Sequence, residues 1–141
     1  MATTRKASTT WTGGLADGRG EVTLQSSGIG TYDVSWAARS EEPNGKTSPE
    51  EMIAAAHSAC FSMALSNALG KAGTPPQQLQ TSAEVDFQPG QGITQIRLSV
   101  RGQVDGIDAD AFVSAAEDAK QNCPVSKALT GVEITLDAAL T

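Results

Sequence analysis

The order of the expected secondary-structure elements indicates an α+β fold for this 141-residue chain. Alternating apolar and polar residues, typical of strands, gather near the N-terminus and again in the middle of the chain. One long apolar helix separates the two groups, and two more helices and a last strand follow. Grouped strands that do not alternate regularly with helices define the α+β class. The length fits a single domain over residues 1–141.

The N-terminal part of the chain is expected to form strands. Val22 and Leu24 alternate with polar neighbours. Tyr32, Val34 and Trp36 share one face at a period of two. We expect strands at 7–11, 21–25 and 32–36, followed by a polar loop at 38–47 that is rich in Glu, Asn, Gly and Lys.

The most distinct helix start is the sequence SPEE, which begins at residue 48. Ser48 suits the N-cap and Pro49 the first helical position, and Glu51 sits three residues after the cap to complete a capping box. The helix is expected over 49–69, which is about 32 Å at 1.5 Å per residue, and it is expected to end at Gly70. Because the helix is apolar nearly all round, we expect it at the centre of the fold.

The C-terminal half is expected to hold a hairpin, two helices and a strand. The segments 83–87 and 96–100 alternate in polarity around a turn and predict paired strands. Asp108 suits the N-cap of a helix that must break before Pro124, because proline lacks an N–H and disfavours helix in the preceding residue. A short helix at 124–129 and a final strand at 132–136 are expected to follow.

Composition and charge exclude several classes of partner. Ten Lys and Arg against 16 Asp and Glu give a net charge of −6 and a pI of about 4.6, so neither nucleic acid nor an anionic membrane surface attracts the chain. Residues 1–10 lack the apolar run of a signal peptide. The stretch 52–70 has no charged residue, but its Ala and Ser content favours a core helix over a membrane span. We expect a cytoplasmic protein.

The two cysteines, Cys60 and Cys123, are the first candidates for chemistry. Their number and separation leave three interpretations: two buried thiols, one structural bridge or a reactive pair. Cys60, inside the long helix, is consistent with a small buried apolar side chain. Cys123 immediately precedes Pro124 and suits the N-cap of the short helix, where the helix dipole and free N–H groups lower a thiol pKa. From the residues alone, Cys123 is therefore the more reactive thiol, although a cysteine that merely fills the helix junction stays possible.

Glu50 and His57 are further candidates on the long helix. The capping box uses Glu51, so Glu50 has no local task beyond a favourable position in the first helical turn. Glu50 and Cys60 are ten residues apart, about 15 Å along one helix, so one site would need both from two copies of the chain. His57 lies three residues before Cys60 and is either a buried core histidine or the base of a Cys–His dyad. None of these side chains has the spacing of a structural zinc site, so no metal is expected.

Two motifs carry a family resemblance. The segment 48–65 reads SPEEMIAAAHSACFSMAL and the segment 122–129 reads NCPVSKAL. This pair resembles the OsmC/Ohr family of thiol peroxidases, and the order of elements agrees over residues 5–140. His57, and the Val-Ser that follows Cys123-Pro124, are similar to the OsmC branch of that family.

The resemblance implies a fold, an activity and a set of site residues. It implies an OsmC-like homodimer of intertwined subunits, with a long central helix on an antiparallel sheet and active sites at the subunit interface. It implies reduction of organic hydroperoxides, and less effective reduction of hydrogen peroxide, without a cofactor but with an external dithiol reductant. Cys60 then matches the peroxidatic cysteine and Cys123 the resolving cysteine. Glu50 matches the family's glutamate, and Arg39 matches its activating arginine better than Arg19 does.

Two other functions stay open at this point. One is a non-catalytic redox sensor or binding protein that uses the same two cysteines as a switch. The other is a hydrolase with a Cys60–His57 dyad. The dithiol peroxidase is the function that we expect, and its thiolate would attack the peroxide, leave a sulfenic acid and resolve to a disulfide.

Overall fold

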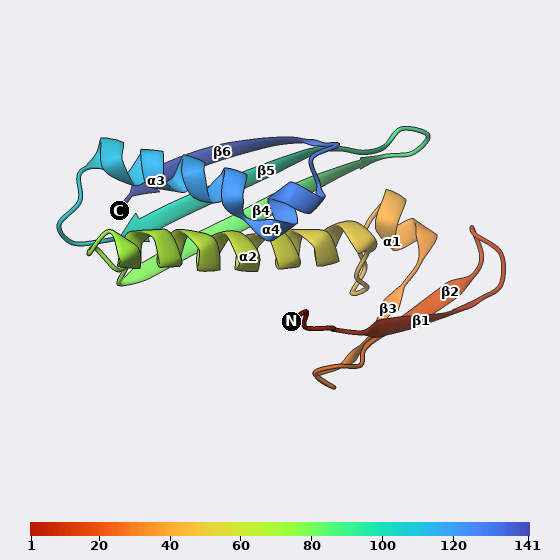
Figure 1. The fold of residues 1–141 in the computed structure, drawn as a ribbon. Helices are drawn as coiled ribbons and strands as arrows, with labels where there is room; N and C mark the ends of the chain where they lie inside the picture. Colours follow the sequence, from red (N-terminus) through yellow and green to blue (C-terminus); the bar gives the residue numbers. More distant parts are fainter. The chain divides into compact units, whose positions relative to one another are not determined.

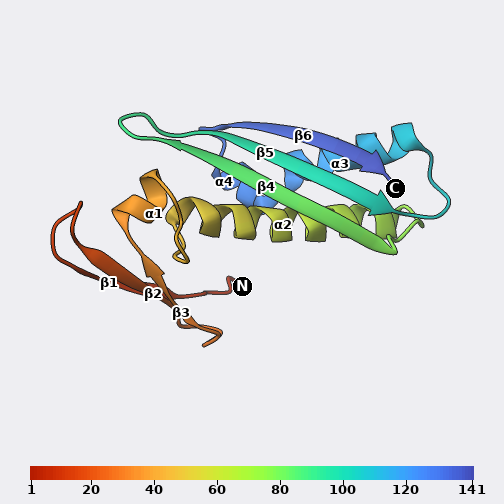
Figure 2. The ribbon, with the colours of Figure 1, turned by 180° about the vertical axis from the view of Figure 1, so that it is seen from behind.

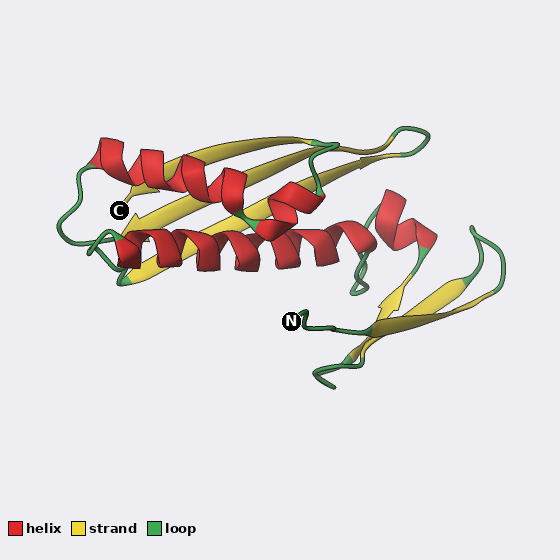
Figure 3. Ribbon diagram, viewed as in Figure 1, coloured by secondary structure: helices red, strands yellow, loops and turns green.

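The computed structural model describes all residues 1–141 and has the expected α+β class (Figure 1). The chain forms two compact units, residues 1–52 and 53–141. Figure 3 shows how strands are grouped in each unit and how helices follow them. The single domain over 1–141 stays a prediction.

The first unit is built on a three-stranded antiparallel sheet in the order β1-β2-β3. Its strands are β1 (Ala7–Thr12), β2 (Arg19–Leu24) and β3 (Thr31–Val34). All three expected strands are therefore confirmed, and Val22 is the apolar side chain that β2 buries.

The third strand is shorter than expected, because a helix begins directly after it. Helix α1 (Trp36–Ser40) starts where the sequence predicts the end of a strand and the beginning of a loop. The hydroxyl of Ser35 accepts a hydrogen bond from the Ala38 N–H at 3.1 Å and so caps a helical turn. The placement of Trp36 in a strand and of residues 38–40 in a loop is therefore wrong, and the helix fixes the position of Arg39.

Helix α2 (Pro49–Lys71) begins as predicted and ends two residues later. Ser48 Oγ accepts the Glu51 N–H at 3.1 Å, whereas the Glu51 carboxylate accepts from the Thr47 hydroxyl at 2.6 Å. At the other end, Gly73 has a φ of +88° and the Thr74 N–H bonds the Leu69 carbonyl at 2.9 Å. This glycine-terminated turn, and not Gly70, ends the helix.

The second unit contains a three-stranded mixed sheet in the order β4-β5-β6. Its strands are β4 (Gln78–Gln88), β5 (Gly92–Gln103) and β6 (Glu133–Leu140). The expected hairpin is confirmed by the antiparallel pairing of β4 and β5, whereas β6 runs parallel to β5. The sheet is therefore not wholly antiparallel, because the chain between β5 and β6 crosses back through two helices before it pairs.

Those two helices are α3 (Ala109–Asn122) and α4 (Pro124–Ala128). Asp108 caps α3 by accepting the Ala111 N–H at 2.8 Å, as predicted. Helices α2 and α3 cover one face of the sheet, and the view from behind shows the sheet on its other side (Figure 2). The break between α3 and α4 falls at Cys123, directly before Pro124, as predicted.

The core of the second unit lies between helices α2 and α3 and the sheet. Its fully buried side chains come from α2, β5 and α3, and include Phe61, Leu65, Leu69, Leu98, Val100 and Phe112. Gly102 of β5 faces Phe112, and a Cβ at this position would lie 2.5 Å from the ring. A glycine is required there because the helix packs this close to the strand.

Helix α2 meets the length and composition of a membrane span. One side of the helix packs into the core through Phe61, Leu65 and Leu69, in agreement with the expected core helix. The opposite side is exposed, and its small and apolar side chains include Ala55, Ala56, Ala59 and Met63, the last with 72% of its surface accessible.

Candidate functional site

The two cysteines, 63 positions apart in the sequence, lie together in the second unit. Cys60 is on α2 and half-buried, and Cys123 is at the α3–α4 junction and fully buried. Both are free thiols, and the two sulfur groups interact with each other directly. A reduced dithiol therefore occupies the centre of this unit, which leaves the reactive pair as the interpretation that the geometry supports.

The two thiols differ in acidity, chiefly because of burial and of their contact with each other. Burial raises the pKa of Cys60, and the adjacent Cys123 raises it further. Burial also raises the pKa of Cys123, but the interaction with the Cys60 thiol and with groups of Ser126 and Val125 in the first turn of α4 outweighs it and leaves that pKa lowered. Cys123 is therefore the more acidic thiol within one chain, but the largest cause of the lowering is the neighbouring Cys60 and not the helix N-terminus from which the sequence predicts it.

His57 is buried beside the thiols and binds a serine. Its Nε2 lies 2.7 Å from the hydroxyl oxygen of Ser126 on α4, and its Nδ1 is buried without a hydrogen-bond partner. Burial lowers the pKa of His57, so the ring is neutral near neutral pH. Because neither ring nitrogen bonds Cys60, the Cys60–His57 dyad of a hydrolase is wrong.

Arg39 and Glu50 form a two-pronged ion pair in the first unit. Arg39 Nε donates to Glu50 Oε1 at 3.0 Å and Oε2 at 3.1 Å, and Nη2 donates to Oε2 at 2.9 Å. Glu50 is only 6% exposed. A buried carboxylate needs a paired positive charge, and the Arg39 guanidinium supplies it. A bidentate contact of this kind fixes the guanidinium orientation. Arg19 is exposed at the start of β2, and thus Arg39 is the arginine that the carboxylate holds.

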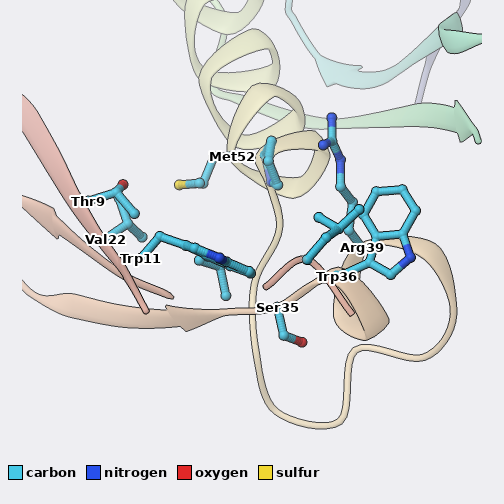
Figure 4. Close-up of a pocket in the computed structure, with 10 residues that line it drawn as sticks. Thr9, Trp11, Val22, Ser35, Trp36, Arg39 and Met52 are labelled. Carbon is cyan, nitrogen blue, oxygen red and sulfur yellow. The ribbon is translucent and has the colours of Figure 1, made fainter. Parts of the chain in front are cut away.

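A cavity of about 230 Å³ lies in the first unit beside Arg39. Its walls come from the sheet β1-β2-β3, from α1 and from the start of α2 (Figure 4). Most of the lining side chains are apolar, among them Trp11, Trp36 and Met52. The cavity therefore offers an apolar surface next to a fixed positive charge.

Sequence reasoning found the cysteines, Glu50 and Arg39 but missed Ser126 and the cavity. Ser126 was visible only as part of the second motif, although it is three residues after Cys123 and thus one helical turn away. Both tryptophans of the chain line the cavity, whereas the sequence indicated Trp11 and Trp36 only as the last residues of two expected strands. No group of three His, Cys, Asp or Glu side chains is placed to hold a metal ion.

An α+β fold that holds two reduced thiols side by side defines a protein built for thiol–disulfide chemistry. The sequence model of OsmC-like proteins matches residues 42–137, and the chain belongs to that family.

Individual relatives agree with this assignment. The peroxiredoxin OsmC of Escherichia coli (strain K12) is 41% identical over 140 residues, which cover 97% of this chain and 96% of that protein. An organic hydroperoxide resistance protein from Elizabethkingia anophelis superposes with a TM-score of 0.74 at 25% identity and full coverage of both chains. An OsmC from Legionella pneumophila has the same fold, with a TM-score of 0.72 at 22% identity over 99% of this chain and 98% of that one.

Proposed function

We propose that this protein is a cysteine-based peroxidase that reduces organic hydroperoxides in the defence against oxidative stress. The observation that carries the proposal is the reduced Cys60–Cys123 dithiol at the centre of an OsmC-like fold. The relationship to a peroxiredoxin at 41% identity over nearly the whole chain supports the same activity.

Cys60 is the peroxidatic residue in this proposal. Its thiolate attacks one peroxide oxygen, the O–O bond breaks, the alcohol leaves after it takes up a proton, and a sulfenic acid forms on Cys60. Cys123 then attacks the sulfenic sulfur, and water leaves as the disulfide forms. An external dithiol reduces the disulfide, so the cycle needs no bound cofactor or metal.

Cys60 requires a cation, because its pKa is raised within one chain. Arg39, held by Glu50, is the cation that the proposal assigns. Glu50 and Cys60 lie ten residues apart on α2, about 15 Å along the helix axis. We therefore propose that the Arg39–Glu50 pair of one subunit activates Cys60 of the other in a homodimer.

The exposed side of α2 supports this assembly. Ala55, Ala56, Ala59 and Met63 form an accessible strip of small and apolar side chains on the side of α2 opposite the core. Small side chains at helical spacing allow a second helix to approach closely. Two copies that pair along this strip bury it and supply the second half of each active site.

The cavity beside Arg39 supports an organic substrate. Its apolar walls favour a peroxide that carries an alkyl or aryl group, and Arg39 is the charged residue among the lining side chains. Burial of an apolar group contributes about 0.8 kcal/mol per methylene, which hydrogen peroxide lacks. We thus expect a preference for organic hydroperoxides. A cytoplasmic location belongs to the same proposal.

A redox switch without turnover is the second candidate function. The observation that favours it is the lowered pKa of Cys123, which suits thiol–disulfide exchange without rapid attack on peroxide by Cys60. Steady-state reduction of peroxide with dithiothreitol as electron donor would rule it out.

The proposed function is tested by peroxide consumption with dithiothreitol and cumene hydroperoxide. Cys60→Ser is expected to abolish consumption. Cys123→Ser is expected to react once and then to over-oxidise at Cys60, since no thiol resolves the sulfenic acid. Full turnover by the Cys60→Ser protein would refute the assignment.

A further inference from the structure

A buried histidine and a buried serine lie next to Cys123, and the reaction described so far uses neither. His57 comes from α2 and Ser126 from α4, two helices that meet in the second unit (Figure 1). His57 is 0% exposed and Ser126 is 5% exposed. His57 Nε2 lies 2.7 Å from Ser126 Oγ. A hydrogen bond between two buried side chains fixes both of them.

Ser126 also reaches the sulfur of Cys123. Cys123 is the N-cap of α4 and Ser126 is its third helical residue, so the two side chains lie one helical turn apart. The Ser126 hydroxyl is among the groups that lower the pKa of Cys123. A line of polar contacts therefore runs from His57 through Ser126 to the Cys123 sulfur.

The unpartnered Nδ1 of His57 indicates which atoms donate and which accept along these contacts. A buried N–H without an acceptor is rarer in proteins than a buried acceptor without a donor. The favoured neutral form therefore carries its proton on Nε2 and leaves Nδ1 as the bare nitrogen. Nε2–H then donates to Ser126 Oγ, and the hydroxyl hydrogen of Ser126 is directed to the Cys123 sulfur.

We propose that His57 and Ser126 form a hydrogen-bond chain that positions Cys123 as the nucleophile for a sulfenic acid on Cys60. This inference rests on the proposed peroxidase function. In the step, the Cys123 thiolate attacks the sulfenic sulfur, the S–S bond forms and the S–O bond breaks. Cys123 is oxidised, the sulfenic sulfur is reduced, and hydroxide leaves and takes up a proton to become water.

Few other charges act on Cys123. Helix α2 presents Cys60 to it, and the strands contribute apolar side chains to the same core cluster. On α3, Lys120 pairs with Glu117 at 3.2 Å, and on α4 Lys127 is exposed. Apart from the Cys60 thiol, the side-chain donor to Cys123 is therefore the hydroxyl of Ser126, and the variants below test this donor.

The first experiment measures the Cys123 pKa directly, by the ultraviolet absorbance of the thiolate in the Cys60→Ser protein. Removing a hydrogen bond to a charged group is expected to raise this pKa by about one unit in Ser126→Ala. His57→Leu is expected to raise it less, because the serine hydroxyl remains. Ser126→Thr, which keeps the hydroxyl, is expected to retain the parent value. Identical titrations of Ser126→Ala, His57→Leu and the parent would overturn the proposal.

The second experiment separates the two chemical steps in a single turnover with cumene hydroperoxide and both cysteines present. Loss of peroxide is expected to be unchanged in Ser126→Ala, because that step belongs to Cys60. Disulfide formation is expected to slow about three- to fivefold, because the higher nucleophilicity of a less acidic thiol offsets part of the lost thiolate fraction. Unslowed disulfide formation would overturn the proposal.

A matched control is Ser62→Ala, which removes a half-buried hydroxyl from α2 that bonds Thr81 Oγ at 2.8 Å and not Cys123. It is expected to leave the titration unchanged. Thermal unfolding identifies any variant that does not fold. If either His57→Leu or Ser126→Ala fails to fold, the other variant still tests the hydrogen-bond chain. If the parent protein consumes no peroxide, the peroxidase function fails, while the titration still decides whether the hydrogen-bond chain exists.

Discussion

Arg39, on the five-residue helix α1, donates hydrogen bonds from Nε and Nη2 to the Glu50 carboxylate at 2.9 to 3.1 Å. The contact holds a guanidinium in one orientation at the beginning of α2. In the proposed dimer this fixed cation acts on Cys60 of the other subunit, which has no cation of its own to offset burial.

Loss of this cation is expected to slow the first chemical step. Arg39→Ala is expected to lower kcat/KM for cumene hydroperoxide by about 100-fold, because a preorganised charge at the reacting atoms is removed. Glu50→Gln is expected to lower it by about tenfold, because a single amide oxygen holds the guanidinium less firmly. Steady-state kinetics with saturating dithiol measure both.

Arg97→Ala is the matched control for Arg39→Ala. Arg97 also pairs with a carboxylate, Asp86, at 2.7 Å, but it lies on the β4–β5 hairpin. Its removal is expected to leave kcat/KM unchanged. An Arg39→Ala protein with undiminished kcat/KM would contradict the assigned role of the ion pair.

Association through the exposed side of α2 is open to a direct test. Ala59→Arg places a long charged side chain on the strip and is expected to shift the protein from dimer to monomer in sedimentation. Because each site of the proposed dimer is shared by two subunits, the same variant is expected to lose most of its peroxidase activity. Val113→Arg, at an accessible apolar position of α3, is the control. A parent protein that sediments as a monomer while fully active would refute the shared site.

The stability of the protein is expected to fall as the pH drops below about 6.5. Burial lowers the pKa of His57 in the folded state, so the unfolded chain binds a proton first. The free energy of unfolding then decreases by up to about 1.4 kcal/mol per pH unit until the folded pKa is reached.

His57 is the single histidine of the chain, so this pH dependence has one source. His57→Gln is expected to remove the slope between pH 6.5 and the lowered pKa of the folded state, as measured by urea unfolding at a series of pH values. A slope of equal size in the variant would show that another group is responsible.

Gly102→Ala is expected to destabilise the second unit by about 1–3 kcal/mol. The new Cβ would lie 2.5 Å from the Phe112 ring, within the packed core, so helix α3 has to shift. Gly131→Ala is the control, because a Cβ there meets no atom within 4 Å. Equal urea midpoints for the two variants would contradict the packing.

Local signals predicted much of the fold. The caps at Ser48 and Asp108 and the break before Pro124 were readable because each depends on a few neighbouring residues. Helix α1 was missed because its cap, Ser35, follows an alternating segment that continues to Trp36. The parallel course of β6 was missed because pairing direction is set by the crossover and not by the strand.

The site was predictable to a different degree. The place of Cys123 before Pro124 predicts a lowered thiol pKa, but the largest cause of the lowering is the Cys60 thiol, which the tertiary fold brings to it. Its proximity to Cys60 and the bond between His57 and Ser126, 69 positions apart, are products of the tertiary fold, which no local pattern encodes. The family resemblance indicated the two cysteines, Glu50 and Arg39 as site residues, and the structure adds the bidentate contact between Arg39 and Glu50.

The central claim is that Cys60 and Cys123 together reduce a peroxide. Its most direct test is a stopped-flow reaction of the reduced protein with one equivalent of cumene hydroperoxide or of hydrogen peroxide, followed by mass analysis. We predict rapid loss of the organic peroxide, slower loss of hydrogen peroxide, and a product lighter by two hydrogens with Cys60 joined to Cys123. Unconsumed peroxide and a protein of unchanged mass would contradict it.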